Sequence, residues 1–233
     1  MAKYPKAVIA AIVKCMRKRK KSRSGSFKMK RCCIFSGGEL ENADFVAVND
    51  TDYVICADSG LKHTLRLGIT PDLVIGDFDS YSGELPESAE CIKCRPEKDD
   101  TDTLMAVKQA ISRGCDEIVI YGAFGGRFDH TIANVQTLRY AMVNGVHAYL
   151  EDSRNKVYML SEGVYELSDE KKKYLSVFAY GGELKIKKLS GVKYPLENAV
   201  LNTDFPLGVS NEIICDRAVI EIDKGTALII CSE

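Results

Sequence analysis

The sequence predicts an α/β fold: a doubly wound, mainly parallel sheet, followed by a small all-β sandwich. Up to about residue 153, short apolar segments rich in β-branched residues alternate with helical patterns. Beyond that point, alternating segments recur between hairpin-type turns without a comparable helical pattern. We therefore expect a basic extension over residues 1–30, an α/β domain over 31–153 and a β-sandwich over 154–233.

The extension differs in charge from the rest of the chain. Residues 1–31 hold 12 basic and no acidic residues, which leaves 20 basic and 33 acidic residues for the remainder. Its apolar stretch precedes its basic run, the reverse of a secretory signal. A basic amphipathic helix on a membrane or nucleic acid is one interpretation. We favour a dispensable extension, or an upstream start with the working domain beginning near Met29, and expect neither a nucleic-acid nor a membrane partner.

The nine cysteines form no disulfide-like framework, so we expect reduced thiols and a cytoplasmic protein. Cys91 and Cys94 have the CxxC spacing of a zinc half-site. A tetrahedral zinc site needs four ligands, and no second pair is evident. We interpret these two cysteines as ordinary thiols.

Five strands are predicted in the α/β domain. They cover Cys32–Phe35, Tyr53–Ala57, Leu73–Ile75, Ile118–Tyr121 and Val146–Leu150. A helix after the second strand runs to about Leu67, where Gly68 suits its C-terminal cap. The next helix follows residues 97–102, with Asp100 or Thr101 as its N-cap. It carries Leu104, Val107 and Ile111 on one face. A last helix covers about 127–143, with an expected inward face of Phe128, Ile132, Val135, Leu138 and Met142.

The sandwich is predicted from four alternating segments: Tyr174–Tyr180, Glu183–Lys188, Ala218–Ile222 and Ala227–Cys231. The turns 181–182 and 223–225 contain the glycines that tight hairpins need.

The stretch Pro71–Ser80, PDLVIGDFDS, is the one around which the chemistry is arranged. Its apolar run suits a buried strand, and Asp77 and Asp79 follow where that strand ends. Two carboxylates this close repel each other and raise each other's pKa. A divalent cation removes the repulsion, and carboxylate oxygens suit Mg²⁺. The alternative is a pair of turn or capping aspartates.

Other strands of this domain also end in glycine or aspartate, and the carboxyl ends of parallel strands meet at one edge. Asp58 with Gly60, Asp100 with Asp102, and the loop 125–130 belong to this group. Glycine-rich turns that open a helix bind phosphate through backbone N–H groups. Arg127 can bind phosphate through two hydrogen bonds, and Lys98 adds a point charge. Asn134 shares a helix face with His130 and can reach a ligand there.

Several of these residues also have a simpler interpretation. Asp58 can merely end a strand, Asp129 can cap the following helix, and Asp99 can be solvated. His130 is better explained as a packed helix residue. The convergence of four polar strand ends on one edge favours a phosphate and metal site over these separate explanations.

These motifs resemble the thiamine pyrophosphokinase family in its bacterial form. The resemblance rests on ADSG (57–60), PDLVIGDFDS (71–80), KDDTDT (98–103), GGRFDH (125–130) followed by Asn134, YPLENA (194–199) and GVSNE (208–212). It covers the chain from about Arg31 onward. Ser59 departs from the family, which usually has a second glycine there. The chain also lacks tryptophan, so any stacking of thiamine on that side chain is missing.

The resemblance implies a homodimer that converts ATP and thiamine to AMP and thiamine diphosphate with Mg²⁺. The ATP-binding domain would be 31–153, and the sandwich 154–233 would bind thiamine across the subunit interface. By motif, Asp77, Asp79 and Asp102 would act catalytically and hold the metal. The implied nucleotide-binding residues are Asp58, Ser59, Gly60, Lys98, Asp100, Gly126, Arg127, Asp129 and Asn134. The implied thiamine contacts are Ser210, Asn211 and Asp129.

The proton of the thiamine hydroxyl would pass to Asp79 or Asp102, and the sequence does not rank the two. Nucleotide-sugar transferases and aspartyl-phosphate phosphatases also use a strand that ends in Asp-x-Asp. The phosphatase pattern fits poorly, because Ser80 directly follows the second aspartate. A sensor of nucleotide or thiamine is a non-enzyme alternative, although the chain keeps all the carboxylates that a sensor can lose.

Overall fold

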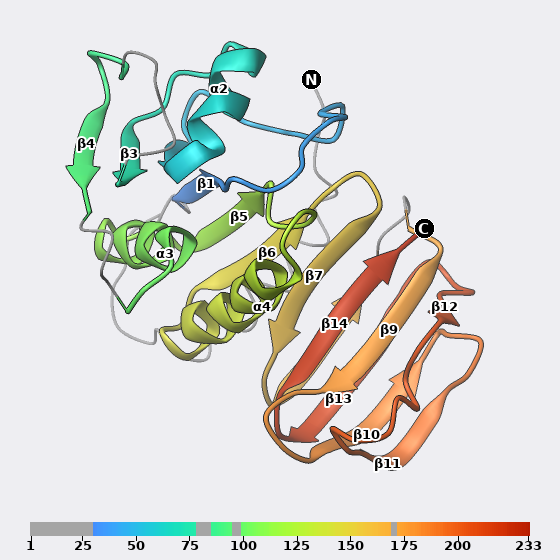
Figure 1. Ribbon diagram of the computed structural model, residues 1–233. Coiled ribbons are helices and arrows are strands. Elements are labelled where there is room, and N and C mark those ends of the chain that lie inside the picture. Colours follow the sequence, from blue (N-terminus) through green and yellow to red (C-terminus); the bar gives the residue numbers. More distant parts are fainter. Residues whose placement is uncertain (1–29, 78–84, 95–98, 169–171) are drawn as a thin grey trace, which may run out of the picture. The chain divides into compact units, whose positions relative to one another are not determined.

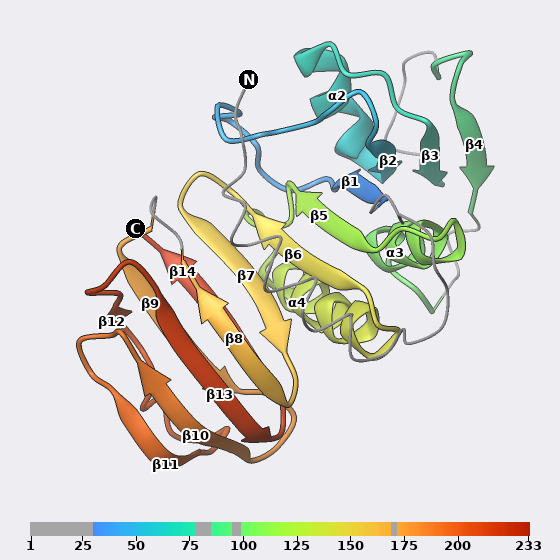
Figure 2. The same cartoon turned by 180° about the vertical axis from the view of Figure 1, so that it is seen from behind.

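The computed structural model describes residues 30–77, 85–94, 99–168 and 172–233. The predicted extension lies outside these residues except for Lys30. Contacts within the chain divide it into two compact units, and their described parts are residues 30–156 and 157–233. Figures 1 and 2 show the elements of both units. Among the described residues, no helix is long and apolar enough to cross a bilayer.

The first unit contains the predicted parallel sheet, with strands in the order β6-β5-β1-β2-β3-β4. Every neighbouring pair in it is parallel. The strands are β1 (Arg31–Phe35), β2 (Tyr53–Ala57), β3 (Leu73–Gly76), β4 (Glu90–Lys93), β5 (Glu117–Tyr121) and β6 (His147–Glu151). The central strands are almost wholly buried, as their β-branched composition predicts. The edge strand β4 was not predicted, because its polar sequence ECIK has no clear strand pattern.

Helices cover both faces of this sheet (Figures 1 and 2). The short 3₁₀ turn η1 (Asp58–Gly60) leads into α2 (Leu61–Leu67), which lies on one face. The helices α3 (Asp102–Ser112) and α4 (Phe128–Val143) lie on the other. The prediction of a doubly wound sheet is therefore confirmed.

The helix boundaries follow the local sequence signals. Gly68 adopts the left-handed conformation at φ 66° and ends α2, as expected of a C-terminal cap. Thr101 is the N-cap of α3, and its hydroxyl accepts a hydrogen bond from the backbone N–H of Leu104 at 3.2 Å. Of the two candidates for this cap, the structure therefore uses Thr101.

The predicted inward face of α4 is wrong in its first two turns. Phe128 is 75% exposed and Ile132 is 45% exposed. The buried face instead runs through Asn134, Thr137, Leu138 and Ala141. Leu138 confirms the prediction, but the rest of this face is formed by polar and small residues, which a search for large apolar side chains missed. The exposed apolar pair lies on the opposite side of the helix, at i and i+4.

The second unit is a sandwich of two sheets, which confirms the predicted all-β class. One sheet has the order β12-β9-β14-β7 and the other β11-β10-β13-β8. The strands are β7 (Asn155–Leu160), β8 (Gly163–Leu167), β9 (Tyr174–Ala179), β10 (Leu184–Ser190), β11 (Leu196–Leu201), β12 (Asn211–Glu212), β13 (Ala218–Lys224) and β14 (Ala227–Ser232). Apolar side chains from both sheets form one core. The prediction found β9, β10, β13 and β14 and missed the other four.

Candidate functional site

Glycines let three strand ends of the first unit approach one another. A Cβ on Gly60 would lie 2.0 Å from the carbonyl oxygen of Phe35, so η1 packs directly against the end of β1. A Cβ on Gly76 would lie 3.0 Å from the Cα of Asp58, so the end of β3 packs against η1. The carboxyl ends of β1, β2 and β3 therefore meet at one edge, where open α/β sheets bind ligands.

A cavity of about 550 Å³ opens at this edge of the first unit. Six of the predicted site residues line it: Asp58, Ser59, Asp102, Gly126, Arg127 and Asn134. They come from η1, the start of α3, and the loop and helix that follow β5. The structure thus brings together residues that are up to 76 positions apart in the sequence. The volume is in the range of small-molecule sites.

Asp58 has two unusual features. Its φ is 48°, in the left-handed region that a residue with a side chain rarely adopts. Its Oδ1 atom is buried and has no hydrogen-bond partner among the described residues. Both features cost free energy, and strained backbone together with unpaired polar atoms is typical of ligand sites. These two features single out Asp58 among the residues that line the cavity.

Ser59 is the departure from the family pattern, and the structure shows how it is accommodated. A Cβ on Gly37 would lie 2.2 Å from the Ser59 hydroxyl oxygen. The absence of a side chain at Gly37 therefore provides the room that the Ser59 side chain needs. Both residues line the cavity.

The loop after β5 presents backbone and a cation to the cavity. Gly122, Gly125 and Gly126 all have positive φ, which bends the chain sharply before α4. Arg127 forms an exposed ion pair with Asp129, with Nη2 and Oδ2 2.6 Å apart. This contact raises the pKa of Arg127 and lowers the pKa of Asp129. Exposed pairs of this kind exchange easily for a ligand phosphate.

Asn134 lies in the cavity wall but has a structural bond. It is 6% exposed, and its Nδ2 donates to the carbonyl oxygen of Ala123 at 2.8 Å. This bond ties α4 to the loop after β5. Asp102 occupies the first turn of α3, where the helix dipole favours a carboxylate.

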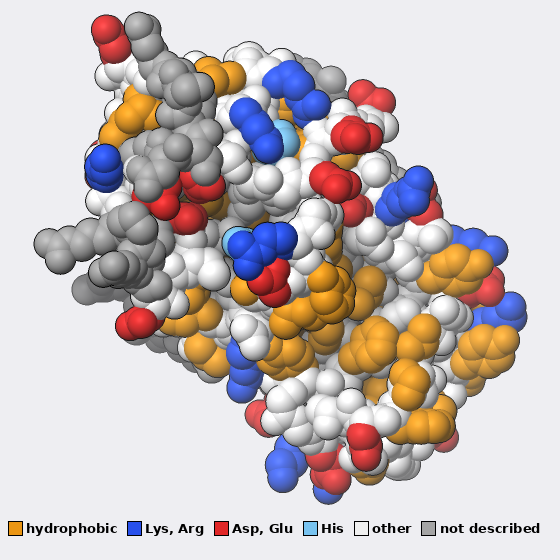
Figure 3. Space-filling view, in the orientation of Figure 1, with side chains coloured by type: hydrophobic (Ala, Val, Ile, Leu, Met, Phe, Trp, Pro, Cys, Tyr) orange, Lys and Arg blue, Asp and Glu red, His pale blue; other side chains and the backbone are white. Residues whose placement is uncertain are grey.

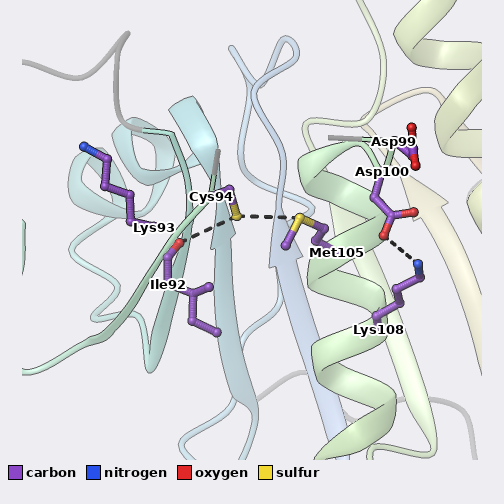
Figure 4. A pocket seen from close by; sticks show the side chains of 7 residues that line it. All are labelled: Ile92, Lys93, Cys94, Asp99, Asp100, Met105 and Lys108. Atoms are coloured by element: carbon purple, nitrogen blue, oxygen red, sulfur yellow. Dashed lines mark hydrogen bonds and ion pairs between the residues drawn. The ribbon is translucent and has the colours of Figure 1, made fainter. Parts of the chain in front are cut away.

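The remaining predicted residues of the first unit lie elsewhere. Asp77 and Gly60 belong to the same sheet edge but are not part of the cavity lining, and neither is Asp129. Asp100 lines a second hollow of about 460 Å³ (Figure 4), where its carboxylate is paired with Lys108 at 2.5 Å. Asp79 and Lys98 lie outside the described residues.

The prediction missed several residues that line the cavity. They are 36–41, Ala57, Lys62, His63, Arg66, Thr101, Thr103, Gly122 and Ala123. The interpretation of His130 as a packed helix residue is wrong, because His130 is exposed and lines the cavity. Lys62 and Arg66 stand one turn apart on α2, and this i, i+4 basic pair after ADSG was a readable signal. His63 is buried, and its Nε2 lies 2.9 Å from the carbonyl oxygen of Gly38. Burial lowers the pKa of His63, so the ring is neutral at pH 7 and donates its Nε2–H to that oxygen.

In the second unit, Ser210 and Asn211 are engaged with the backbone. Ser210 has φ 58°, and its N–H donates to the Ser176 hydroxyl at 3.0 Å. The Asn211 amide is 6% exposed and both donates to and accepts from the backbone of Tyr194, at 2.8 and 2.9 Å. Asn211 thus fixes the segment that carries Tyr194.

Large apolar side chains near these two residues are exposed. Their exposed fractions are 60% for Tyr194, 64% for Phe205, 54% for Leu207, 44% for Val209 and 64% for Ile214. We call these five residues the apolar patch. In the first unit, Phe128 and Ile132 of α4 are also exposed. Figure 3 shows that hydrophobic side chains gather on this face of the molecule. Gathered exposed apolar side chains are typical of interaction surfaces.

A doubly wound sheet with a polar cavity at its carboxyl edge defines a class of nucleotide- and phosphate-binding α/β proteins. Two family descriptions match the chain. "Thiamin pyrophosphokinase, catalytic domain" matches residues 46–150, and "Thiamin pyrophosphokinase, vitamin B1 binding domain" matches residues 164–227. A relative from Bacillus subtilis, thiamine pyrophosphokinase, is 33% identical over 186 residues, or 76% of this chain and 86% of the relative.

Solved structures of thiamine pyrophosphokinases are also similar to this chain. The crystal structure of thiamine pyrophosphokinase from Bacillus subtilis has a TM-score of 0.80 at 29% identity, over 87% of this chain and 99% of that one. A thiamin pyrophosphokinase family protein from Enterococcus faecalis has a TM-score of 0.76 at 30% identity, over 88% and 99%. The chain belongs to the thiamine pyrophosphokinase family, and its function is that of a thiamine pyrophosphokinase.

Proposed function

We propose that the chain transfers the diphosphoryl group of ATP to the primary hydroxyl of thiamine and releases AMP, with the cavity of the first unit as the site of transfer. The site is inferred mainly from Asp58, which lines the cavity together with Arg127 and Gly126 and whose Oδ1 is buried without a hydrogen-bond partner among the described residues. A site that offers carboxylates, backbone N–H groups and a guanidinium suits a metal–triphosphate.

The donor set of the cavity fits Mg²⁺ bound together with a nucleotide. Mg²⁺ in such sites uses one or two carboxylates and completes its coordination with phosphate oxygens and water. Asp58 and Asp102 both line the cavity. No cluster of three candidate metal ligands occurs among the described residues. Asp79, a member of the proposed set with Asp77 and Asp102, is outside them. When bound, Mg²⁺ would neutralise charge on the β and γ oxygens.

The residues of the chain then have separate tasks. Arg127 releases Asp129 and binds a phosphate oxygen through two N–H groups. Lys62 and Arg66 offset the charge of a tetra-anionic nucleotide in the same cavity. The carboxylate of Asp102 or Asp79 accepts the proton of the thiamine hydroxyl as that oxygen approaches the β-phosphorus in line with the departing AMP oxygen.

We also propose that thiamine binds between the first unit of one subunit and the sandwich of another in a homodimer. The apolar patch supports this, because its five large apolar side chains are 44–64% exposed and groups of exposed apolar side chains are typical of interaction surfaces. Ser210 and Asn211 lie beside the patch, and the bonds of Asn211 give it the task of placing Tyr194. Direct contacts of Ser210, Asn211 and Asp129 with thiamine remain part of the proposal.

We place the enzyme in the cytoplasm. All eight cysteines of the described residues are free thiols, as a reducing compartment allows. Cys91 is exposed and Cys94 is buried, with its sulfur 3.6 Å from that of Met105 (Figure 4).

Product analysis tests the reaction. The full chain is incubated with ATP, thiamine and Mg²⁺, and nucleotides and thiamine esters are measured by mass spectrometry. We expect equal amounts of AMP and thiamine diphosphate. ADP with thiamine monophosphate would contradict diphosphoryl transfer, and the absence of any thiamine ester would contradict the function.

A further inference from the structure

The loop 36–41 lies between α2 and the glycine loop 122–126, and both line the cavity. On one side its backbone continues the pairing of β1 with β5. Ser36 N–H donates to Tyr121, Gly38 N–H to Gly122 and Glu39 N–H to Phe124, at 2.9, 2.8 and 2.8 Å. On the other side, His63 and Arg66 of α2 donate to the carbonyl oxygens of Gly38 and Leu40. The loop is therefore held from both sides.

The side chain of Glu39 completes this arrangement. Its Oε1 accepts a hydrogen bond from the backbone N–H of Gly126 at 3.2 Å. Its aliphatic part lies against Gly125, where an added Cβ would be 2.5–2.7 Å from Glu39 Cδ, Cγ and Cβ. Gly125 and Gly126 have φ values of 83° and 63°. Two successive glycines have wide conformational freedom. A hydrogen bond at this point therefore strongly reduces the number of backbone conformations that the loop can adopt.

We propose that Glu39 is a positioning residue for nucleotide binding: it holds Gly126 in its left-handed conformation and thereby places Arg127 at the cavity. This inference rests on the proposed function of the cavity as the ATP site. Glu39 acts through Gly126 and needs no contact with the nucleotide.

A carboxylate beside a phosphate site also repels anions, so the two effects of Glu39 oppose each other. The repulsion is weakened because the side chain is exposed to water and ions, and because Lys62 and Arg66 line the same cavity. The hydrogen bond acts directly on the residue before Arg127. We therefore expect the positioning effect to be the larger one.

The test compares Glu39→Ala, Glu39→Gln and a control, Asp44→Ala, which removes an exposed carboxylate five residues further along the chain and outside the cavity lining. The dissociation constant of MgATP is measured by titration calorimetry without thiamine. Glu39→Ala should weaken binding about three- to tenfold, the effect of one lost hydrogen bond. Glu39→Gln keeps an acceptor oxygen and should stay within about twofold of the wild type, as should Asp44→Ala.

Amide hydrogen exchange in the nucleotide-free protein provides an independent measurement. Glu39→Ala should accelerate exchange at Gly126 and Arg127, and Asp44→Ala should not. Unchanged exchange and affinity in Glu39→Ala would overturn the proposal, and tighter MgATP binding would show that the carboxylate obstructs the site. Both measurements omit thiamine. A failure of thiamine diphosphate synthesis in the wild type is therefore distinguishable from a failure of this inference.

Discussion

The two units of the chain use their functional residues in different ways. In the first unit, a carboxylate oxygen of Asp58 is buried and has no hydrogen-bond partner in the described part of the chain, and Arg127 is paired with Asp129 at the surface. In the second unit, the polar side chain of Asn211 is fully engaged with the backbone, and the exposed groups nearby are apolar. The first unit is therefore prepared for a charged ligand, and the second for burial against an apolar surface.

This difference predicts the largest effect at Asp58. Asp58→Asn should lower kcat by two orders of magnitude or more, because the lost charge faces the metal–phosphate group. The same change should leave the melting temperature equal or higher. Asparagine tolerates a positive φ, and it removes the charge from a side chain that has one buried oxygen without a hydrogen-bond partner among the described residues. Steady-state kinetics and calorimetric unfolding test both parts.

The control for Asp58 is Asp99→Asn, which changes an exposed aspartate that does not line this cavity. It should alter kcat by less than about twofold. A fall in the melting temperature of Asp58→Asn together with near-normal turnover would mean that Asp58 stabilises the fold and does not serve a charged ligand, which would contradict the account of the first unit.

The next effect concerns the apolar patch. The double change Phe205→Ser and Leu207→Ser should dissociate the dimer and raise the KM for thiamine by about tenfold or more. Binding of MgATP should be unaffected, since the cavity belongs to the first unit. Sedimentation velocity measures the oligomeric state, and steady-state kinetics measure the KM for thiamine. A monomeric wild type, or a dimer that keeps its thiamine KM after the change, would refute the shared site.

Asn211→Ala should have a smaller effect of two kinds. It leaves the backbone N–H and C=O of Tyr194 without their partners, which costs about 1–3 kcal/mol of unfolding free energy. Misplacement of the Tyr194 segment should raise the KM for thiamine several-fold and leave the KM for ATP unchanged. Denaturant titration and kinetics test this, and a selective change in the KM for ATP would contradict it.

The smallest effect is a pH dependence of stability in the first unit. Burial, with a contribution from Lys156, lowers the pKa of His147 to about 4. The unfolded chain, with a histidine pKa of about 6.5, binds this proton more readily. The contribution of neutral His147 to the free energy of unfolding is therefore fully present above about pH 6.5 and is lost as the pH drops towards 4.

The loss attributable to His147 should be about 1–2 kcal/mol at pH 5. Urea titrations at pH 7 and 5 measure it, and His147→Gln should remove this part of the pH dependence. An equal loss in both proteins would assign the effect to other groups.

The sequence predicted those features that depend on local chemistry. The β-branched runs identified five strands of the parallel sheet, and glycine with aspartate identified its polar edge. Contacts made only in three dimensions were not predictable, such as Glu39 on Gly126 or the space that Gly37 leaves for Ser59. The buried face of α4 was missed because Asn134, Thr137 and Ala141 carry no apolar signal.

The central claim is that the bond broken in ATP lies between the α- and β-phosphates. Two nucleotide analogues test it directly, with thiamine and Mg²⁺ present. A β,γ-imido analogue keeps a cleavable α–β bond and should release AMP while thiamine gains an imidodiphosphate. An α,β-methylene analogue should only inhibit. Transfer of a single phosphate from the methylene analogue, with the imido analogue inert, would contradict the account.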